Sequence, residues 1–353
     1  MTPCNQGKTF LRARATASAI SLCLLSQTAA WGADTPATTP ASVVPHYKVS
    51  QKIAIGGDAR WDLLTMDSKA QRLYVSHGNQ TEVIDTGKNQ LIATIPNTNG
   101  VHGIAIASEL GLGFTSNGRD NTVGVFDLAT LKVTKTIAVG SNPDVIFYDA
   151  ISQRLISFNG KSKDATIIDP KTLNVVATVA IGGKPELADS DGNGKVWFNV
   201  EDSNELALLD PIAAKISLRV SIKPCDSPTG VATDAQHRVY SVCDNNLVVV
   251  TGPDGKPLGK AAIGAGPDGV VWQDGYAFSA NGKDGTISVV GQNADGQWET
   301  FATIPTERGA RTIAGDPATH KLYLPSAEFK PAQAGAKPQG IANTFHIIVL
   351  ERQ

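Results

Sequence analysis

"RLYVSHGNQTEVID", residues 72–85, returns in altered form six more times before the chain ends. Three of the later copies are "LGFTSNGRDNTVGVFD" (112–127), "RLISFNGKSKDATIID" (154–169) and "KVWFNVEDSNELALLD" (195–210). The central residues of the seven copies are separated by 40, 42, 41, 43, 38 and 45 residues, and they are Tyr74, Phe114, Ile156, Trp197, Tyr240, Phe278 and Tyr323. Self-similarity at such a period is typical of stacked supersecondary units.

Each repeat contains four short runs of β-branched and aromatic residues, separated by Gly, Pro, Asn and Asp. Runs of this length and composition predict strands. Four strands in about forty residues form one blade of a β-propeller. The sequence therefore predicts an all-β fold with seven blades over residues 46–353.

The two ends of the repeat region predict how the ring closes. The segment "YKVSQKIAIG" (47–56) matches the fourth strand of other repeats, for example "LKVTKTIAVG" (131–140), yet it precedes the first repeat. The last repeat ends on its third strand, "FHIIVLE" (345–351). We therefore expect the N-terminal strand to complete blade seven, which removes the exposed sheet edges.

The repeat region resembles the YncE-like, or YVTN-repeat, family of exported seven-bladed propellers. The resemblance is carried by "RLYVSHG" (72–78), "GPDG" (266–269) and the repeated "VID" (83–85), and by unit count it covers residues 46–353. It implies an exported protein, and it also implies single-stranded DNA binding, which has been proposed for one relative. A propeller fold by itself does not specify an activity.

The first thirty residues have the pattern of a secretory signal peptide. Lys8, Arg12 and Arg14 precede the apolar stretch "ASAISLCLLSQTAA" (17–30), which ends in small residues. Residues 31–45, rich in Thr, Pro and Ala, predict a flexible linker. No later stretch is long and apolar enough for a membrane span. We expect a monomer in the periplasm or secreted from the cell.

The charge and the cysteines of the mature chain follow from removal of the signal peptide. Without residues 1–30 the chain keeps 28 Lys and Arg against 33 Asp and Glu, a formal net charge of −5. A nucleic-acid binder normally shows a basic patch instead. Only Cys225 and Cys243 remain, and two cysteines in an oxidising compartment predict one disulfide, with a thiolate metal site as the alternative.

Seven polar or charged positions recur just before the first strand of each blade, on the face where propeller loops form a mouth around the axis. They are Asp62, His102, Asp144, Glu186, Thr229, Asp268 and Arg311, with Arg60, Trp61, Lys184 and Arg308 nearby. Asp is also common in turns because its side chain bonds the local backbone. The ring is therefore open to a structural interpretation and to a functional one.

In the functional interpretation, the carboxylates and His102 bind a cation. That cation is a divalent metal, or an amine oriented by Trp61, with Arg308 and Arg311 meeting an anionic part of the ligand. A binding protein for a small molecule, a metal or a periplasmic partner is one hypothesis. A hydrolase or lyase resembling lactonases, acting through a metal-bound water or through His102 with a carboxylate, is another.

Four further features lie outside the ring, and all but the third-strand aspartates are open to a structural and a functional interpretation. His77 occupies a turn position that other blades fill with Asn, and it is also the best partner for His102 in a two-histidine site. "DSDGNG" (189–194) opens like a calcium loop, but Val200 stands where a ligating Glu is needed. The aspartates that end the third strands predict turn caps. The long segment 325–343 of blade seven predicts a functional loop at the mouth, or a disordered one.

Overall fold

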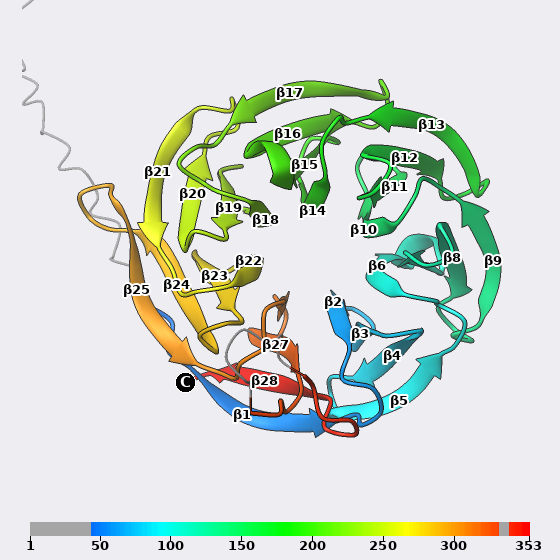
Figure 1. The fold of residues 1–353 in the computed structure, drawn as a ribbon, viewed down its shortest axis with the longest axis horizontal. Helices are drawn as coiled ribbons and strands as arrows, with labels where there is room; N and C mark the ends of the chain where they lie inside the picture. Colours follow the sequence, from blue (N-terminus) through cyan, green and yellow to red (C-terminus); the bar gives the residue numbers. More distant parts are fainter. Residues whose placement is uncertain (1–43, 332–338) are drawn as a thin grey trace, which may run out of the picture. The chain divides into compact units, whose positions relative to one another are not determined.

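Each repeat folds into a four-stranded antiparallel sheet, as the sequence predicts. The computed structural model describes residues 44–331 and 339–353, and within them seven such sheets are arranged around a common axis (Figure 1). The predicted all-β, seven-bladed propeller is therefore confirmed. Two single 3₁₀ turns, η1 (Ser108–Leu110) and η2 (Glu201–Ser203), are the helical elements of the described residues.

In six blades the four strands follow chain order from the axis to the rim. Blades one to three contain β2 (Trp61–Asp67), β3 (Arg72–His77), β4 (Gln80–Asp85) and β5 (Gln90–Ile95); β6 (Val101–Ala107), β7 (Leu112–Asn117), β8 (Thr122–Asp127) and β9 (Val133–Ala138); and β10 (Pro143–Asp149), β11 (Arg154–Asn159), β12 (Asp164–Asp169) and β13 (Asn174–Ala180). Blades four to six contain β14 (Pro185–Ser190), β15 (Val196–Val200), β16 (Glu205–Asp210) and β17 (Lys215–Ser221); β18 (Pro228–Thr233), β19 (Val239–Cys243), β20 (Leu247–Thr251) and β21 (Pro257–Ala262); and β22 (Pro267–Gln273), β23 (Tyr276–Asn281), β24 (Thr286–Gln292) and β25 (Trp298–Pro305).

Blade seven is assembled from both ends of the described chain. It contains β26 (Ala314–Asp316), β27 (Lys321–Ser326), β28 (His346–Arg352) and, at the rim, the N-terminal strand β1 (Tyr47–Ala54). β1 pairs antiparallel with β28, and the Tyr47 hydroxyl donates a 2.7 Å hydrogen bond to Asp274 in blade six. The predicted ring closure by the N-terminal strand is therefore confirmed.

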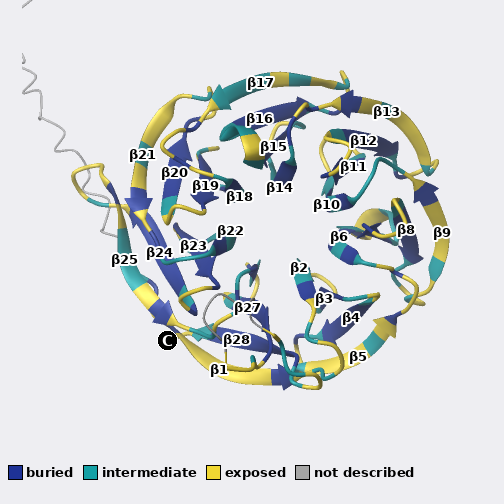
Figure 2. Cartoon of the chain, in the orientation of Figure 1, coloured by how far each residue is buried: buried dark blue, intermediate teal, exposed yellow. Residues whose placement is uncertain are grey.

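The core lies between neighbouring blades, which explains the apolar runs of the sequence. The seven central residues of the repeats, from Tyr74 to Tyr323, are between 0% and 1% exposed because each lies on a second strand packed on both faces. The fourth strands form the rim of the propeller, where most of their residues face solvent. β5 and β13 are therefore mostly exposed (Figure 2). Packing between two blades therefore buries both faces of the second strands, such as β3 and β7.

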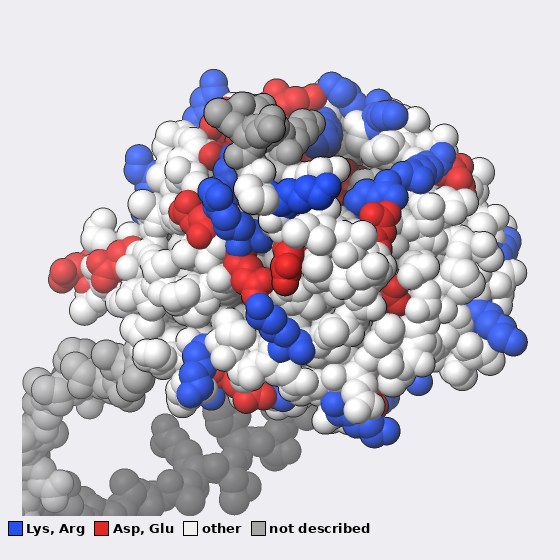
Figure 3. Space-filling view, turned by 60° about the horizontal axis from the view of Figure 1, so that its bottom comes forward, with Lys and Arg blue, Asp and Glu red and all other residues white. Residues whose placement is uncertain are grey.

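The predicted signal peptide, residues 1–30, lies outside the described residues, as does most of the predicted linker. At the end of that linker, Pro45 is buried and Val44 packs against the core cluster that contains Tyr47. The described residues contain no helix with the length and apolarity that a membrane crossing requires. Basic and acidic side chains are interspersed over the face seen in Figure 3, without a continuous field of one sign.

Candidate functional site

A β-bulge at the start of the innermost strand positions the predicted polar residue in six of the seven blades. In blade one Trp61 pairs with His77 and Leu64 pairs with Val75, so Asp62 and the residue after it stand outside the regular ladder. The same register shift precedes Ile104, Ile146, Ala188, Val231 and Gly269 in the next five blades. A bulge frees a side chain from the alternation of its strand and re-aims it.

Six of the seven ring residues therefore lie inside their strands, and not before them as the sequence pattern predicts. Asp62 is the second residue of β2, and His102 is the second residue of β6. Short hydrogen bonds from second strands hold the bulges, since the amide of Asp62 donates to Ser76 Oγ at 2.8 Å and Ser116 Oγ donates to the carbonyl of Asp144 at 2.5 Å. In blade seven, Arg311 does precede its strand, β26.

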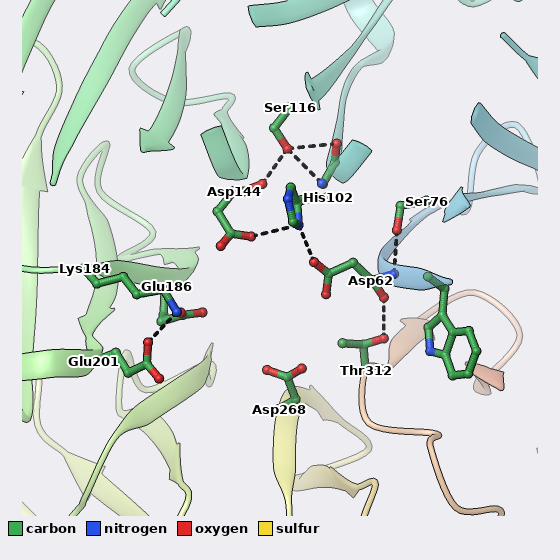
Figure 4. Close-up of polar contacts among 12 residues, drawn as sticks. Asp62, Ser76, His102, Ser116, Asp144, Lys184, Glu186, Glu201, Asp268 and Thr312 are labelled. Atoms are coloured by element: carbon green, nitrogen blue, oxygen red, sulfur yellow. Dashed lines mark hydrogen bonds and ion pairs between the residues drawn. The ribbon is translucent and has the colours of Figure 1, made fainter. Parts of the chain in front are cut away.

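Asp62, His102 and Asp144 meet at the mouth from three consecutive blades (Figure 4). His102 Nδ1 lies 2.6 Å from Asp62 Oδ2 and 3.5 Å from Asp144 Oδ1. One potential ligand atom from each of the three residues lies within 4.8 Å of the other two. Among the described residues this is the single group of three or more His, Cys, Asp or Glu side chains close enough to hold a metal ion.

The electrostatics of this group favour a cation. Burial alone would lower the pKa of His102, but its hydrogen bond to Asp62 and the charge of Asp144 outweigh burial and raise the pKa above the usual 6.5. The pKa of Asp144 is raised by its own burial and by the charge of Asp62, against the opposing effect of His102. When it is protonated, this imidazole lies within ion-pair distance of both carboxylates.

Arg311 joins this group to the next carboxylate of the ring. Its Nη2 lies 3.1 Å from Asp62 Oδ1, and its Nε donates a 2.6 Å hydrogen bond to Asp268 Oδ2. Burial raises the pKa of Asp268 to about 6 even though Arg311 opposes the shift, and the charges of Asp62 and Asp144 add to it. One guanidinium is therefore shared between two carboxylates.

The fourth carboxylate, Glu186, pairs with a lysine that serves two acids. Lys184 Nζ lies 2.5 Å from Glu186 Oε1 and 2.5 Å from Glu201 Oε2. Burial and the charge of Asp144 raise the pKa of Glu186 well above its usual 4.5, and Lys184 opposes that rise only in part. The mouth therefore holds more carboxylates than its cations neutralise.

Other predicted site residues lie apart from this group. His77 is buried and not an exposed partner of His102, because its Nδ1 lies 2.7 Å from Glu82 Oε1 and its Nε2 lies 2.6 Å from the carbonyl of Asp58. Trp61 stacks on Phe345, with ring centroids 5.5 Å apart, and does not present a free face. The exposed guanidinium groups of Arg60 and Arg308 make no contact with the carboxylate ring among the described residues.

The remaining sequence motifs have structural roles. In "DSDGNG", Asp189 accepts hydrogen bonds from Thr233 of the next blade, and Asp191 caps its own turn, so the carboxylates do not converge. The third-strand aspartates cap turns as expected; Asp127, for example, accepts from the amide of Thr130 at 2.7 Å.

Two cysteines form a disulfide-capable pair in blade five. Cys225 and Cys243 are both buried, and their Cα atoms lie 5.3 Å apart. That separation falls within the range that a disulfide requires.

Two cavities open at the mouth. One of about 540 Å³ lies over blades one to three and is lined by Asp62 and His102, and one of about 930 Å³ is lined mainly by blades five to seven. Gly309, Arg311 and Phe329 line both. Phe329 belongs to the long blade-seven loop; part of that predicted loop, residues 332–338, lies outside the described residues.

Sequence reasoning missed Glu201, although a signal for it exists. Blades two, three and six place Gly118, Gly160 and Gly282 after the second strand, and blade four places Glu201 there. Glu201 stands where these blades have glycine, and it reaches Lys184. Comparison of the blades at this position identifies the residue.

Solved structures share the fold at low sequence identity. The RRP9 WD40 repeats align with a TM-score of 0.72 at 11% identity, covering 87% of this chain and 100% of that chain. The structure of U3-55K gives 0.70 at 10%, covering 84% and 97%, and Kuenenia stuttgartiensis hydrazine synthase gives 0.68 at 13%, covering 83% and 97%. No protein-family model and no curated protein matches the sequence. At these identities the similarity establishes the propeller fold alone.

Proposed function

We propose that this protein is an exported, periplasmic or secreted, binding protein that holds a divalent metal ion at the mouth of its propeller. The observation that carries the proposal is the convergence of Asp62, His102 and Asp144 from three blades, with ligand atoms within 4.8 Å of one another. Hydrogen bonds between serine side chains and the backbone fix the three bulges, at Asp62, at Asp144 and at Gly103 next to His102, so the group is already assembled before a metal arrives.

The donor types suit a first-row divalent metal ion such as Zn²⁺ or Mn²⁺. Imidazole nitrogen and carboxylate oxygen both bind Zn²⁺ at about 2.0–2.2 Å, and three protein ligands leave a coordination position for a bound small molecule or water. His102 Nδ1 already faces both carboxylates, and a metal bound there would require that nitrogen to be free of its proton. The raised pKa of Asp144 supports the same conclusion, since an added positive charge would relieve the repulsion.

Export is supported by the leader pattern of residues 1–30 and by the paired cysteines. The seven-bladed fold agrees with the resemblance to the YVTN-repeat family. Single-stranded DNA binding is a weaker proposal at this mouth, because the carboxylate ring would repel a phosphate backbone.

Metal analysis and calorimetry test the proposal. We expect the parent protein to bind one Zn²⁺ or Mn²⁺ per chain, and the His102→Ala/Asp144→Ala variant to lose that binding. His320→Ala is a matched control, because His320 forms a His–Asp pair with Asp274 outside the mouth. Failure of the parent to bind either metal, or retention of binding in the double variant, would refute the proposal.

A second candidate function is acid–base catalysis by a hydrolase or lyase. The observation that favours it is the orientation of His102: Nδ1 bonds Asp62, while Nε2 has no hydrogen-bond partner among the described residues. A carboxylate-oriented imidazole with one open nitrogen can act as a general base. Turnover of a lactone panel that survives a chelator but is lost in His102→Ala would support this candidate over the metal-binding one.

A further inference from the structure

The larger cavity at the mouth differs in charge from the metal-ligand group. The cavity has a volume of about 930 Å³. Four cationic side chains line it, Lys283, Arg308, Arg311 and Lys330, together with three acidic ones, Glu201, Asp244 and Asp268. This volume is suited to a small organic molecule. The cavity therefore forms a subsite distinct from Asp62, His102 and Asp144.

Most of these charges are already paired. Lys283 lies 3.0 Å from Asp244, Arg311 lies 2.6 Å from Asp268, and Lys184 lies 2.5 Å from Glu201. No carboxylate of the described residues lies within ion-pair distance of Arg308. Positive charge is therefore left over on the blade-seven side of the cavity.

Arg308 is oriented as well as unpaired. Its Nε donates a 3.2 Å hydrogen bond to the carbonyl of Lys283, and its own carbonyl accepts from Ser326 Oγ at 3.2 Å. The Nε bond holds the guanidinium against blade six, the Ser326 bond fixes the backbone of Arg308, and the two terminal nitrogens have no partner among the described residues. A guanidinium with both terminal nitrogens open binds a carboxylate through two parallel hydrogen bonds.

An aromatic surface lies next to this guanidinium. Phe329 packs over Gly309, where an added Cβ would lie 2.5 Å from the ring, and its other neighbour is Trp61 at a centroid distance of 6.1 Å. Gly282 similarly leaves room for Arg311, because a Cβ there would lie 2.6 Å from that side chain. Glycines therefore let an aromatic ring and a cation line the same wall.

We propose that this cavity binds a small organic carboxylate with a planar apolar body. The carboxylate pairs with the terminal nitrogens of Arg308, with Lys283 and Lys330 adding positive potential, and the apolar body packs on Phe329. The subsite goes beyond the proposed metal binding and does not depend on it, because none of its residues is one of the three metal donors.

Calorimetry with benzoate, benzamide and acetate tests the subsite on the full mature chain in the presence of a chelator, so that its failure is distinguishable from failure of the metal site. Benzoate should bind at millimolar concentration, and uncharged benzamide and the smaller acetate should bind at least tenfold more weakly. Arg308→Gln should reduce benzoate affinity to that of benzamide, and Phe329→Ala should reduce it to that of acetate.

Arg119→Gln is the matched control, because Arg119 is an exposed arginine at the mouth that contacts Asn79 on the blade-two side. This variant should bind benzoate with unchanged affinity. Equal binding of benzoate and benzamide, equal losses in Arg308→Gln and Arg119→Gln, or no saturable benzoate binding by the parent would each overturn the proposal.

Discussion

The buried pair of His77 and Glu82 in blade one is expected to be a large and reversible contributor to stability. Their side chains are 3% and 2% exposed, and His77 Nδ1 lies 2.7 Å from Glu82 Oε1. His77 Nε2 lies 2.6 Å from a backbone carbonyl. Both partners only accept hydrogen bonds, so both ring nitrogens donate and the imidazole is protonated.

The residues at the same positions of blade three suggest which substitutions to test. Where blade one has His77 and Glu82, blade three has Asn159 and Thr166, whose side chains are joined by a 3.0 Å hydrogen bond. His77→Asn alone leaves a buried carboxylate without its cation, which should cost about 3–5 kcal/mol in the free energy of unfolding. The double variant His77→Asn/Glu82→Thr installs the neutral pair of blade three and should recover most of that loss.

The pH dependence of the free energy of unfolding follows from the pKa shifts of His77 and Glu82. Burial alone would lower the pKa of His77, but the bonds to Glu82 and to the Asp58 carbonyl raise it above 6.5. The stability that this shift contributes is fully present below 6.5 and is lost as the pH rises through the raised pKa. Burial alone would raise the pKa of Glu82, but bonds from His77 and Thr94 lower it, so its contribution is lost in acid.

Urea unfolding at about pH 6 and about pH 9 measures both effects. The parent should lose more stability between these pH values than the double variant does. His320→Asn is the control, because the His320 side chain is half exposed and Asp274 keeps its contacts with Tyr47 and Arg352, so the loss should be less than about 1 kcal/mol. A His77→Asn variant within about 1 kcal/mol of the parent, or a double variant no more stable than the single one, would refute the reasoning.

Three further predictions concern the mouth, the disulfide and ring closure. Zn²⁺ affinity should rise by about tenfold per pH unit up to the raised pKa of His102, because the metal displaces a proton; pH-independent binding by calorimetry would contradict this. Reduction should lower the free energy of unfolding by about 3 kcal/mol, and only reduced, unfolded protein should be labelled at both Cys225 and Cys243; labelling of the native oxidised protein would exclude the bond. Deletion of residues 46–56 should abolish cooperative unfolding followed by circular dichroism, and an unchanged transition would exclude closure by β1.

The blades could be predicted because their cause is local and repeated. Each second strand is packed on both faces, so a central apolar residue such as Tyr74 or Tyr240 must recur with every blade. The match between the segment at 47–56 and the other fourth strands revealed the closure for the same reason. Both signals are periodic, and periodicity is visible in one sequence.

The contacts within the site could be predicted only in part. The ring positions recur with the blades, but the pairing between neighbouring ring side chains depends on the β-bulges. No residue type in the sequence predicts these bulges. The sequence favours a turn role for His77, because its partner Glu82 lies on the next strand. The signal was present in the paired departure of His77 and Glu82 from the Asn and Thr of blade three.

The bulge at the start of the innermost strands separates what holds the ring together from what faces its axis. The ladder on either side, as between Trp61 and His77 or Leu64 and Val75, keeps its register whatever side chain stands at position 62. Six blades repeat this arrangement. The side chains that face the mouth can therefore change one blade at a time while the strand pairing of the propeller stays the same, so new combinations of ring residues can give new binding specificities.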